Sequence, residues 1–372
     1  MKNIKNKIES YLKEDAYILD HQIKKKKFLN IIKYQLKHHI KNCKNYRLWY
    51  QKNNFIKPDK IKIYDDIPYV PSAAFKSVEL KSIKKKTKVI RSSGSSGHNK
   101  SMIAIDSVTS ELQKKCLIKI LKSAIGEDRR KFFIADAEPR EYFGQRLVSA
   151  RYAGMSGYLL ASTERNYLFK INDKNELKVD VQILKKLNSL IDKEPIVIIG
   201  YTYIIYDHLI KNRSFQLAKS ICNNQTKLLH FGGWKKLNNS KVSKEIFNKE
   251  VAKKLKISDQ NILDVYGFSE QLGTIYVSKG LGGCKVSNFS HILIRDPKSL
   301  KVVEDGKVGF MQFLSVLPLS YPGISILNDD MGYISKRTLD DNVENIEFKV
   351  QSRLDKLELR GCGDTLPDHY YI

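Results

Sequence analysis

The sequence predicts an α/β protein with a helical N-terminus, a largely parallel sheet covered by helices, and a β-rich C-terminal part. Three observations support this. Apolar residues recur at helical spacing over residues 4–50. From about residue 87, short β-rich runs alternate with helical stretches, the pattern of a parallel sheet with helices on its faces. After residue 270, apolar runs are joined by turns containing Gly and Asp, with no helical stretch between them.

The elements follow from local patterns. Residues 4–50 are predicted as helix, and prolines make 67–71 an extended segment, because proline cannot continue a helix. Strands are predicted at 88–91 and 102–105, on either side of a loop. The further predicted strands are 132–135, 158–160, 196–199, 228–231, 262–266, 292–294, 310–316, 324–327 and 333–334, and the further helices lie near 107–124, 141–153, 177–191, 203–212 and 243–256.

The net charge of the chain suggests nucleic-acid binding, but the distribution of the charged residues argues against it. The chain has 372 residues, enough for one large domain or two ordinary ones, and a formal net charge of +26. Such a charge ordinarily favours nucleic acid or acidic membranes. The excess, however, is mostly lysine scattered among Asn and Ile, a bias typical of AT-rich genomes. We therefore expect no nucleic-acid partner, whereas a phosphate-bearing substrate would benefit from the positive field.

The cysteines and the apolar runs indicate a reduced, soluble, cytoplasmic protein. The five cysteines are odd in number and widely spaced, with no pair at zinc-binding spacing. Residues 1–15 are charged and polar, unlike a secretory signal, and the uncharged run 196–206 is too short to span a bilayer. Four cysteines are interpreted as core or surface residues: Cys43, Cys116, Cys222 and Cys284.

Residues 92–100 read Ser-Ser-Gly-Ser-Ser-Gly-His-Asn-Lys, and this loop is the most informative feature of the chain. Its small residues expose backbone N–H groups that phosphate oxygens can approach, and Lys100 adds a positive charge. A Walker A loop opens directly into a helix, whereas residues 102–105 are predicted as a strand. A flexible linker is the structural alternative.

A strand–loop–strand hairpin of this composition resembles the phosphate loop of the adenylate-forming enzymes, roughly [ST]SGTTGxPK, with Asn99 at the proline position. The resemblance implies that Lys100 is catalytic and that the loop binds the phosphates of ATP. The loop residues assigned to ATP are Ser92, Ser93, Gly94, Ser95, Ser96 and Gly97.

Further motifs of that superfamily follow in the same order. Residues 266–270, Tyr-Gly-Phe-Ser-Glu, resemble its YGxTE motif, which supplies an aromatic face for adenine, a hydroxyl near the α-phosphate and a carboxylate for Mg²⁺. Residues 230–234 resemble its glycine-containing strand end, 306–309 its GexGe turn, and 328–332 its TGDxG motif. Ordinary turns between strands are the structural alternative. The residues thereby assigned to ATP are Gly232, Gly233, Trp234, Tyr266, Gly267, Ser269, Glu270 and Asp330, with Glu270 also holding Mg²⁺ and Asp330 the ribose.

The C-terminal part narrows the resemblance. Residues 352–355, Ser-Arg-Leu-Asp, match the hinge of the superfamily, and Arg353 is assigned to ATP; we expect the mobile domain beyond the hinge to be absent. The tail Arg-Gly-Cys-Gly at 360–363, with Phe-Lys at 75–76, resembles the acyl-protein synthetase (LuxE) family. That resemblance implies that Cys362 accepts the acyl group, and Arg360 would favour its thiolate.

The resemblance implies ATP- and Mg²⁺-dependent activation of a carboxylic acid, expected to be fatty, to acyl-AMP, transfer of the acyl group to Cys362, and delivery to a partner acyl reductase. We expect an N-terminal segment at 1–85, an adenylate-forming core at 86–350 and a hinge-like tail at 351–372. Two alternatives stay open: a CoA ligase of the phenylacetate type, and a basic binding protein without enzymatic activity.

Overall fold

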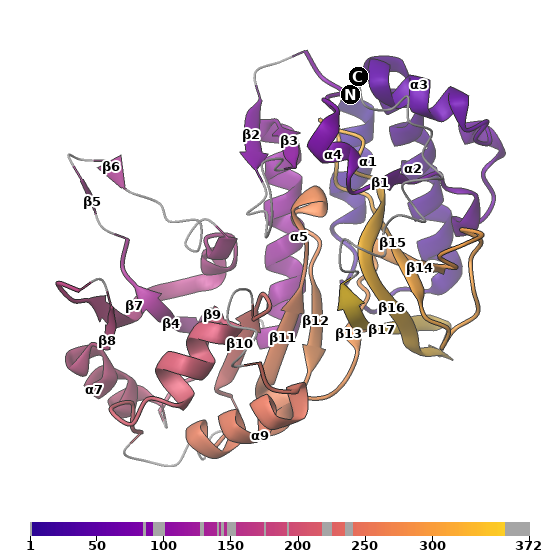
Figure 1. Cartoon of the computed structure of the whole chain (residues 1–372). Helices are drawn as coiled ribbons and strands as arrows, with labels where there is room; N and C mark the ends of the chain where they lie inside the picture. The colour runs from indigo at the N-terminus through magenta and orange to yellow at the C-terminus, as the bar shows by residue number, and fades with distance from the viewer. Residues whose placement is uncertain are drawn as a thin grey trace. The chain divides into compact units, whose positions relative to one another are not determined.

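The computed structural model describes residues 2–84, 87–91, 101–126, 130–139, 141–142, 145–146, 154–174, 176–191, 193–217, 225–234 and 241–353. The chain forms two compact units, whose elements are labelled in Figure 1. The first unit comprises residues up to Cys116, Gly267–Tyr276 and the chain from Lys285. The second comprises Leu117–Tyr266 and Val277–Cys284. The predicted division at residues 85 and 350 rests on sequence motifs and stays a prediction.

Helices open the first unit: α1 (Lys2–Tyr11), α2 (His21–Asn42) and α3 (Lys44–Lys52). The predicted helical stretch is therefore interrupted. Asp20 starts α2 afresh, because its carboxylate accepts the backbone N–H groups of Gln22 and Ile23, both at 2.9 Å. Helix α2 then buries the apolar stripe that the spacing predicts. None of the described helices is long and apolar enough to cross a membrane.

An antiparallel sheet packs with these helices in the first unit. Its strands lie in the order β14 (Ser290–Arg295), β15 (Gly309–Ser315), β16 (Ser325–Asp340) and β17 (Val343–Arg353), and β1 (Val70–Pro71) pairs in parallel with β16. Asp341 and Asn342, with φ of 49° and 61°, form the tight turn between β16 and β17. Figure 1 shows α2 beside these strands, where buried Gln35 donates hydrogen bonds to the carbonyls of Val316 (2.8 Å) and Pro318 (3.0 Å).

A hairpin and short helices complete the first unit. The strands β2 (Lys88–Arg91) and β3 (Met102–Ile105) pair antiparallel, which confirms the predicted hairpin around 92–100. Asp106 follows β3 and accepts the N–H of Thr109 at 2.8 Å in the first turn of α5. The remaining elements with residues here are η1 (Pro58–Lys60), η2 (Tyr64–Asp66), α4 (Ala74–Ser77), α5 (Ser107–Ile125), η7 (Ser269–Gln271), β12 (Tyr276–Lys279) and β13 (Cys284–Lys285).

The second unit contains the predicted parallel sheet. Its strands lie in the order β11 (Ile262–Tyr266), β10 (Lys227–Phe231), β9 (Ile196–Tyr201), β4 (Arg130–Ala137) and β7 (Ser162–Ile171), and β8 (Leu177–Val179) adds an antiparallel edge. All residues of β9 are buried, as expected for a parallel strand covered on both faces. The remaining elements are β5 (Glu141–Tyr142), β6 (Gln145–Arg146), η3 (Tyr158–Ala161), α7 (Val181–Leu190), α8 (Thr202–Ile204), the π-helix η4 (Ile205–Ile210), α9 (Lys244–Leu255) and η6 (Asp259–Asn261).

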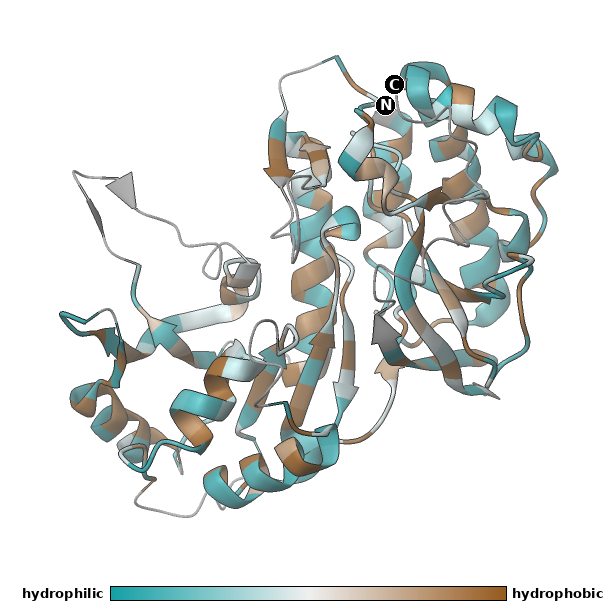
Figure 2. Cartoon of the chain, viewed as in Figure 1, coloured by the Kyte–Doolittle hydropathy of each residue, from teal (hydrophilic) through white to brown (hydrophobic). Residues whose placement is uncertain are grey.

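The hydropathy pattern explains both the correct and the wrong assignments. Figure 2 shows teal and brown residues alternating along α9, the amphipathic pattern that predicted this helix. The predicted strand at 158–160 is wrong, because a short apolar run also suits the buried 3₁₀ turn η3. Residues 141–146 were expected to be helical, but they contain the strands β5 and β6. Residues 177–179 likewise form a strand before α7 begins.

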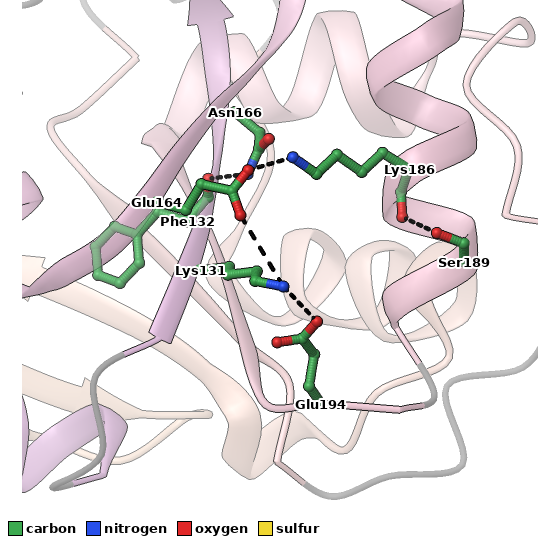
Figure 3. Close-up of polar contacts among 7 residues, drawn as sticks. All are labelled: Lys131, Phe132, Glu164, Asn166, Lys186, Ser189 and Glu194. Carbon is green, nitrogen blue, oxygen red and sulfur yellow. Dashed lines mark hydrogen bonds and ion pairs between the residues drawn. The ribbon is translucent and has the colours of Figure 1, made fainter.

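Strand β7 was not predicted, because polar side chains interrupt its apolar residues. Figure 3 shows how these side chains are paired. Lys131 of β4 lies 2.7 Å from Glu194 and 4.0 Å from Glu164 of β7, and Lys186 of α7 also pairs with Glu164. Asn166 donates a 3.4 Å hydrogen bond to the carbonyl of Phe132. Charge pairing therefore lets a strand rich in polar residues join the sheet.

Candidate functional site

The loop at 92–100 and the tail lie outside the described residues. This applies to Ser92, Ser93, Gly94, Ser95, Ser96, Gly97, Lys100 and Cys362. The register of the hairpin, with Arg91 opposite Met102, nevertheless brings the two ends of the loop side by side. Ser101 is the first described residue after the loop, and it is buried. A short loop between paired strands is therefore the setting of the predicted phosphate-binding segment.

Glu270 lies in the first unit, in the turn η7, and is only 8% exposed. Burial raises the pKa of its carboxyl above the ordinary value, and the Asp329 carboxylate acts in the same direction. A hydrogen bond with the Ser101 side chain and the charge of Lys76 partly oppose this rise in the pKa. The predicted metal ligand therefore lies next to the end of the loop, with a second carboxylate and one lysine nearby.

The backbone around Glu270 is held by hydrogen bonds from distant segments. The Tyr321 hydroxyl donates to the carbonyl of Glu270 at 3.0 Å, and the Gln113 side chain donates to that hydroxyl at 3.3 Å. The side chain of Gln271 donates to the carbonyls of Phe313 (2.9 Å) and Gly323 (2.8 Å). The carboxyl of Glu270 is thus presented by a rigid turn.

Two glycines allow these close approaches. A Cβ on Gly323 would lie 2.2 Å from the Tyr321 ring and 2.9 Å from the carbonyl oxygen of Glu270. Gly273 has a φ of +89°, and its Cβ would lie 2.5 Å from the Cα of Gln113. Neither position accepts a larger residue without a shift of the backbone.

Asp330 lies in an irregular part of β16. Phe310 of β15 pairs with Met331, and Gln312 pairs with Leu327, so β16 advances four residues while β15 advances two. Such a bulge redirects side chains and is common beside active sites. The backbone of Asp330 is paired with that of Arg353 on β17, which brings these two predicted site residues together.

Sequence reasoning gave no role to four residues around Glu270. Ser72 donates a 2.8 Å hydrogen bond to the Asp329 carboxylate, and Lys76 follows it on α4. Asp329 was within the 328–332 motif, but only its neighbour Asp330 was assigned. Tyr321 was assigned no role from the sequence. The sequence shows only that these residues are polar and lie near motifs. It does not show the contacts that they make with distant parts of the chain.

In the second unit, predicted residues follow the carboxyl ends of adjacent parallel strands, where open α/β sheets bind ligands. Tyr266 ends β11, and Gly232 and Gly233 follow β10. Gly232 has a φ of +73°, and its Cβ would lie 3.0 Å from the Tyr201 ring, whereas a Cβ on Gly233 would meet no atom within 4 Å. The Trp234 ring packs against the ring of Tyr206, 5.1 Å between centroids.

His230 is a buried core residue. Burial lowers the pKa of its imidazole, so the ring is neutral at pH 7. Its Nδ1 lies 3.0 Å from the hydroxyl of Thr202, which donates to the carbonyl of Phe231 at 3.3 Å. Within the described residues, no group of three His, Cys, Asp or Glu side chains is arranged to hold a metal ion.

Comparisons with known proteins agree with this fold. One curated relative, a long-chain-fatty-acid–luciferin-component ligase of Aliivibrio fischeri, is 23% identical over 195 residues. That match covers 52% of this chain and 50% of the relative, so it spans about half the length of each.

Solved structures extend the comparison to most of the chain. An open conformation of 2-hydroxyisobutyryl-CoA ligase, in complex with 2-HIB-AMP and CoA, has a TM-score of 0.62 at 12% identity and covers 91% of this chain and 72% of its own. The same ligase in the postadenylation state has a TM-score of 0.61 at 14% identity and covers 91% and 70%. At these identities the likeness shows the fold, which is that of the adenylate-forming ligases.

The family comparison covers almost the whole sequence. The sequence profile described as "Acyl-protein synthetase, LuxE" matches residues 5–370. This chain therefore belongs to the acyl-protein synthetase (LuxE) family.

Proposed function

We propose that this protein activates a carboxylic acid with ATP and then carries the acyl group as a thioester on Cys362. In the first step a carboxylate oxygen attacks the α-phosphorus of ATP, the bond to the β-phosphate oxygen breaks, and acyl-AMP and pyrophosphate form. The single observation that carries the proposal is the buried Glu270 carboxylate beside Ser101, at the end of the glycine- and serine-rich loop. Family membership and the adenylate-forming fold support it.

The surroundings of Glu270 suit a divalent cation. The Asp329 carboxylate adds negative charge near the Glu270 carboxyl, and carboxylate oxygen is a preferred ligand of Mg²⁺. When bound there, Mg²⁺ would neutralise charge on the phosphates of ATP. In our proposal the amides of residues 92–97 and Lys100 bind the β- and γ-phosphates, while Ser269 lies near the α-phosphate.

The remaining assignments concern the nucleoside. We propose that Tyr266 and Gly267 contact adenine, and that Asp330, beside Arg353 on the paired strand, holds the ribose hydroxyls. Gly232 and Gly233 follow β10 and would let the nucleotide approach the backbone. For Trp234 we propose a supporting role, because its ring already packs on Tyr206.

In the second step the Cys362 thiolate attacks the acyl carbonyl, AMP leaves, and a protein thioester forms. The described cysteines do not compete for this role: Cys43, Cys116 and Cys284 are buried thiols, with exposures of 2%, 0% and 8%. We further propose that the thioester passes to a partner acyl reductase. The name of the curated relative supports a long-chain fatty acid as the substrate, and we further propose a cytoplasmic location.

A second candidate is a CoA ligase, favoured by the solved relatives that were crystallised with CoA. One experiment separates the two. The full chain is incubated with Mg·ATP and a panel of labelled carboxylic acids, with and without CoA. We expect hydroxylamine-sensitive label on the protein, retained in Cys43→Ser, a control at a helix N-cap that serine suits, and lost in Cys362→Ser.

Label that survives Cys362→Ser would overturn the acceptor assignment. A CoA-dependent product without protein label would favour the CoA ligase. Release of no pyrophosphate with any acid would contradict both enzymes and would favour a binding protein.

A further inference from the structure

Lys76 is a lysine whose charge acts on the Glu270 carboxyl, and no sequence motif assigns it a role. It lies on α4 (Ala74–Ser77), directly after the extended proline segment, and its side chain is exposed. Its positive charge acts to lower the pKa of the Glu270 carboxyl, against the larger effect of burial. An exposed lysine whose charge acts on a buried carboxyl needs an explanation, because the residue before it, Phe75, is fully buried.

The burial of Phe75 holds the backbone next to Lys76 in place. Phe75, the preceding residue, is fully buried, and its ring packs edge-on against Tyr321 with 6.1 Å between centroids. Tyr321 is the residue that hydrogen-bonds to the carbonyl of Glu270. The start of α4 is therefore tied, through one aromatic contact, to the turn that presents Glu270.

A second tie connects the same turn of chain to β16. Ser72 donates its N–H to the carbonyl of Leu327 at 2.9 Å and its hydroxyl to the Asp329 carboxylate at 2.8 Å. The N–H of Phe75 donates to the carbonyl of Ser72 at 3.2 Å, so the chain turns tightly between Ser72 and Lys76. The backbone of Lys76 thus follows a turn that is tied to the Glu270 turn through Phe75 and to the 328–330 bulge through Ser72.

This position has a chemical meaning in the proposed reaction. Glu270 would act at the metal and the phosphates, and Asp330 in the bulge would act at the ribose. The group of ATP that lies between the ribose and the outer phosphates is the α-phosphate. We propose that the Lys76 ammonium binds the α-phosphate of ATP and stabilises the negative charge that accumulates there as the carboxylate attacks. This inference rests on the proposed function.

Lysine suits this task because its ammonium is a compact point charge on a flexible stem, held here on a fixed turn. The structural alternative is that Lys76 only offsets the negative charges of Glu270 and Asp329. That alternative predicts an effect on stability and metal affinity, without selectivity for a phosphate on the ligand.

The test compares two ligands that differ only in the α-phosphate, adenosine 5′-monophosphate and adenosine, by calorimetric titration of the full chain. For Lys76→Met we expect the affinity for adenosine monophosphate to fall about tenfold, the loss of one charged hydrogen bond, while the affinity for adenosine is unchanged. Lys76→Arg should retain most of the affinity. Lys114→Met, an exposed lysine of α5, is the matched control and should bind both ligands as the unmodified protein does.

Acid-dependent exchange of pyrophosphate into ATP supplies the kinetic readout. Lys76→Met should lower kcat by about a hundredfold while the KM for ATP changes much less, because the contact strengthens in the transition state. If Lys76→Met lost affinity equally for adenosine monophosphate and adenosine, or kept an unchanged kcat, the proposed role of Lys76 would be wrong. Unmodified protein that binds adenosine monophosphate but shows no exchange with any acid would instead contradict the proposed function, and the ligand comparison would still decide the phosphate contact.

Discussion

The phenol of Tyr321 donates a 3.0 Å hydrogen bond to the backbone carbonyl of Glu270. This contact joins segments separated by 51 residues, and Gln113 of α5 supports it from the other side. The position of the Glu270 carboxyl therefore depends on an uncharged hydrogen bond inside the first unit. Its consequences can be measured separately from the chemistry of the carboxyl itself.

Removing the Tyr321 hydroxyl should loosen the turn that carries Glu270. In Tyr321→Phe the carbonyl of Glu270 and the amide of Gln113 each lose a partner, so we expect the free energy of unfolding to fall by about 1–2 kcal/mol. Pyrophosphate release should slow as well, because a small displacement of a metal ligand is costly. Urea unfolding and a pyrophosphate assay measure the two effects. Tyr34→Phe, an exposed tyrosine of α2, should leave both unchanged.

The raised pKa of Glu270 makes a signed prediction about stability and pH. Burial favours the neutral carboxyl in the folded state, so ionisation costs stability as the pH rises through the raised pKa. Glu270→Gln, which is always neutral, should match the unmodified protein at acidic pH and become more stable than it at neutral pH, by about 1.4 kcal/mol for each unit of the rise. Urea unfolding in the absence of nucleotide tests this. The pH is varied from about 4, near the ordinary pKa of a carboxyl group, to about 8. A difference that does not change with pH would contradict the buried carboxyl.

Two glycines with similar backbone angles separate strain from steric overlap. Gly273 and Gly306 have φ of +89° and +86°, but a Cβ would meet neighbours within 4 Å only at Gly273, where the Cα of Gln113 lies closest. Gly306→Ala should therefore cost about 1 kcal/mol for the left-handed backbone alone. Gly273→Ala should cost several times as much, because the overlap is with backbone and the neighbour cannot rotate away. Equal losses in thermal or urea unfolding would show that the turn is not packed on α5.

Adjacent aspartates in the β16 bulge should behave differently. Asp330→Ala should weaken ATP binding, and the loss should disappear when 2′,3′-dideoxy-ATP replaces ATP, since the proposed partners are the ribose hydroxyls. Asp329→Ala breaks the 2.8 Å hydrogen bond from Ser72 and should weaken ATP and its dideoxy analogue equally. Titration of each variant with both nucleotides measures this. A ribose-dependent loss in Asp329→Ala alone would move the ribose assignment by one residue.

Local pattern was sufficient for part of the fold. The strands at 88–91 and 102–105 were predicted to the residue, because small and charged residues mark both ends of each apolar run. Strand β7 was not predicted, since Glu164 and Asn166 find partners only after β4 and α7 are in place. The run 158–160 was too short to distinguish a strand from a buried turn.

The candidate site shows the same division. The motif containing Glu270 is contiguous in sequence and was found there. Three long-range features bring other residues to this motif: the hydrogen bond of Tyr321, the bulge that contains Asp329, and the ring contact of Phe75, which precedes Lys76. Local sequence spacing encodes none of these features. Their roles become visible only when the turn, the strand and α4 are assembled.

In the proposed reaction a carboxylate oxygen attacks the α-phosphorus of ATP. It is tested most directly by supplying a carboxylic acid labelled with ¹⁸O in its carboxyl group, together with Mg·ATP, and analysing the products by mass spectrometry. We expect ¹⁸O from the acid to appear in AMP and not in pyrophosphate or phosphate. Label in inorganic phosphate, or AMP without label, would contradict acyl-AMP formation.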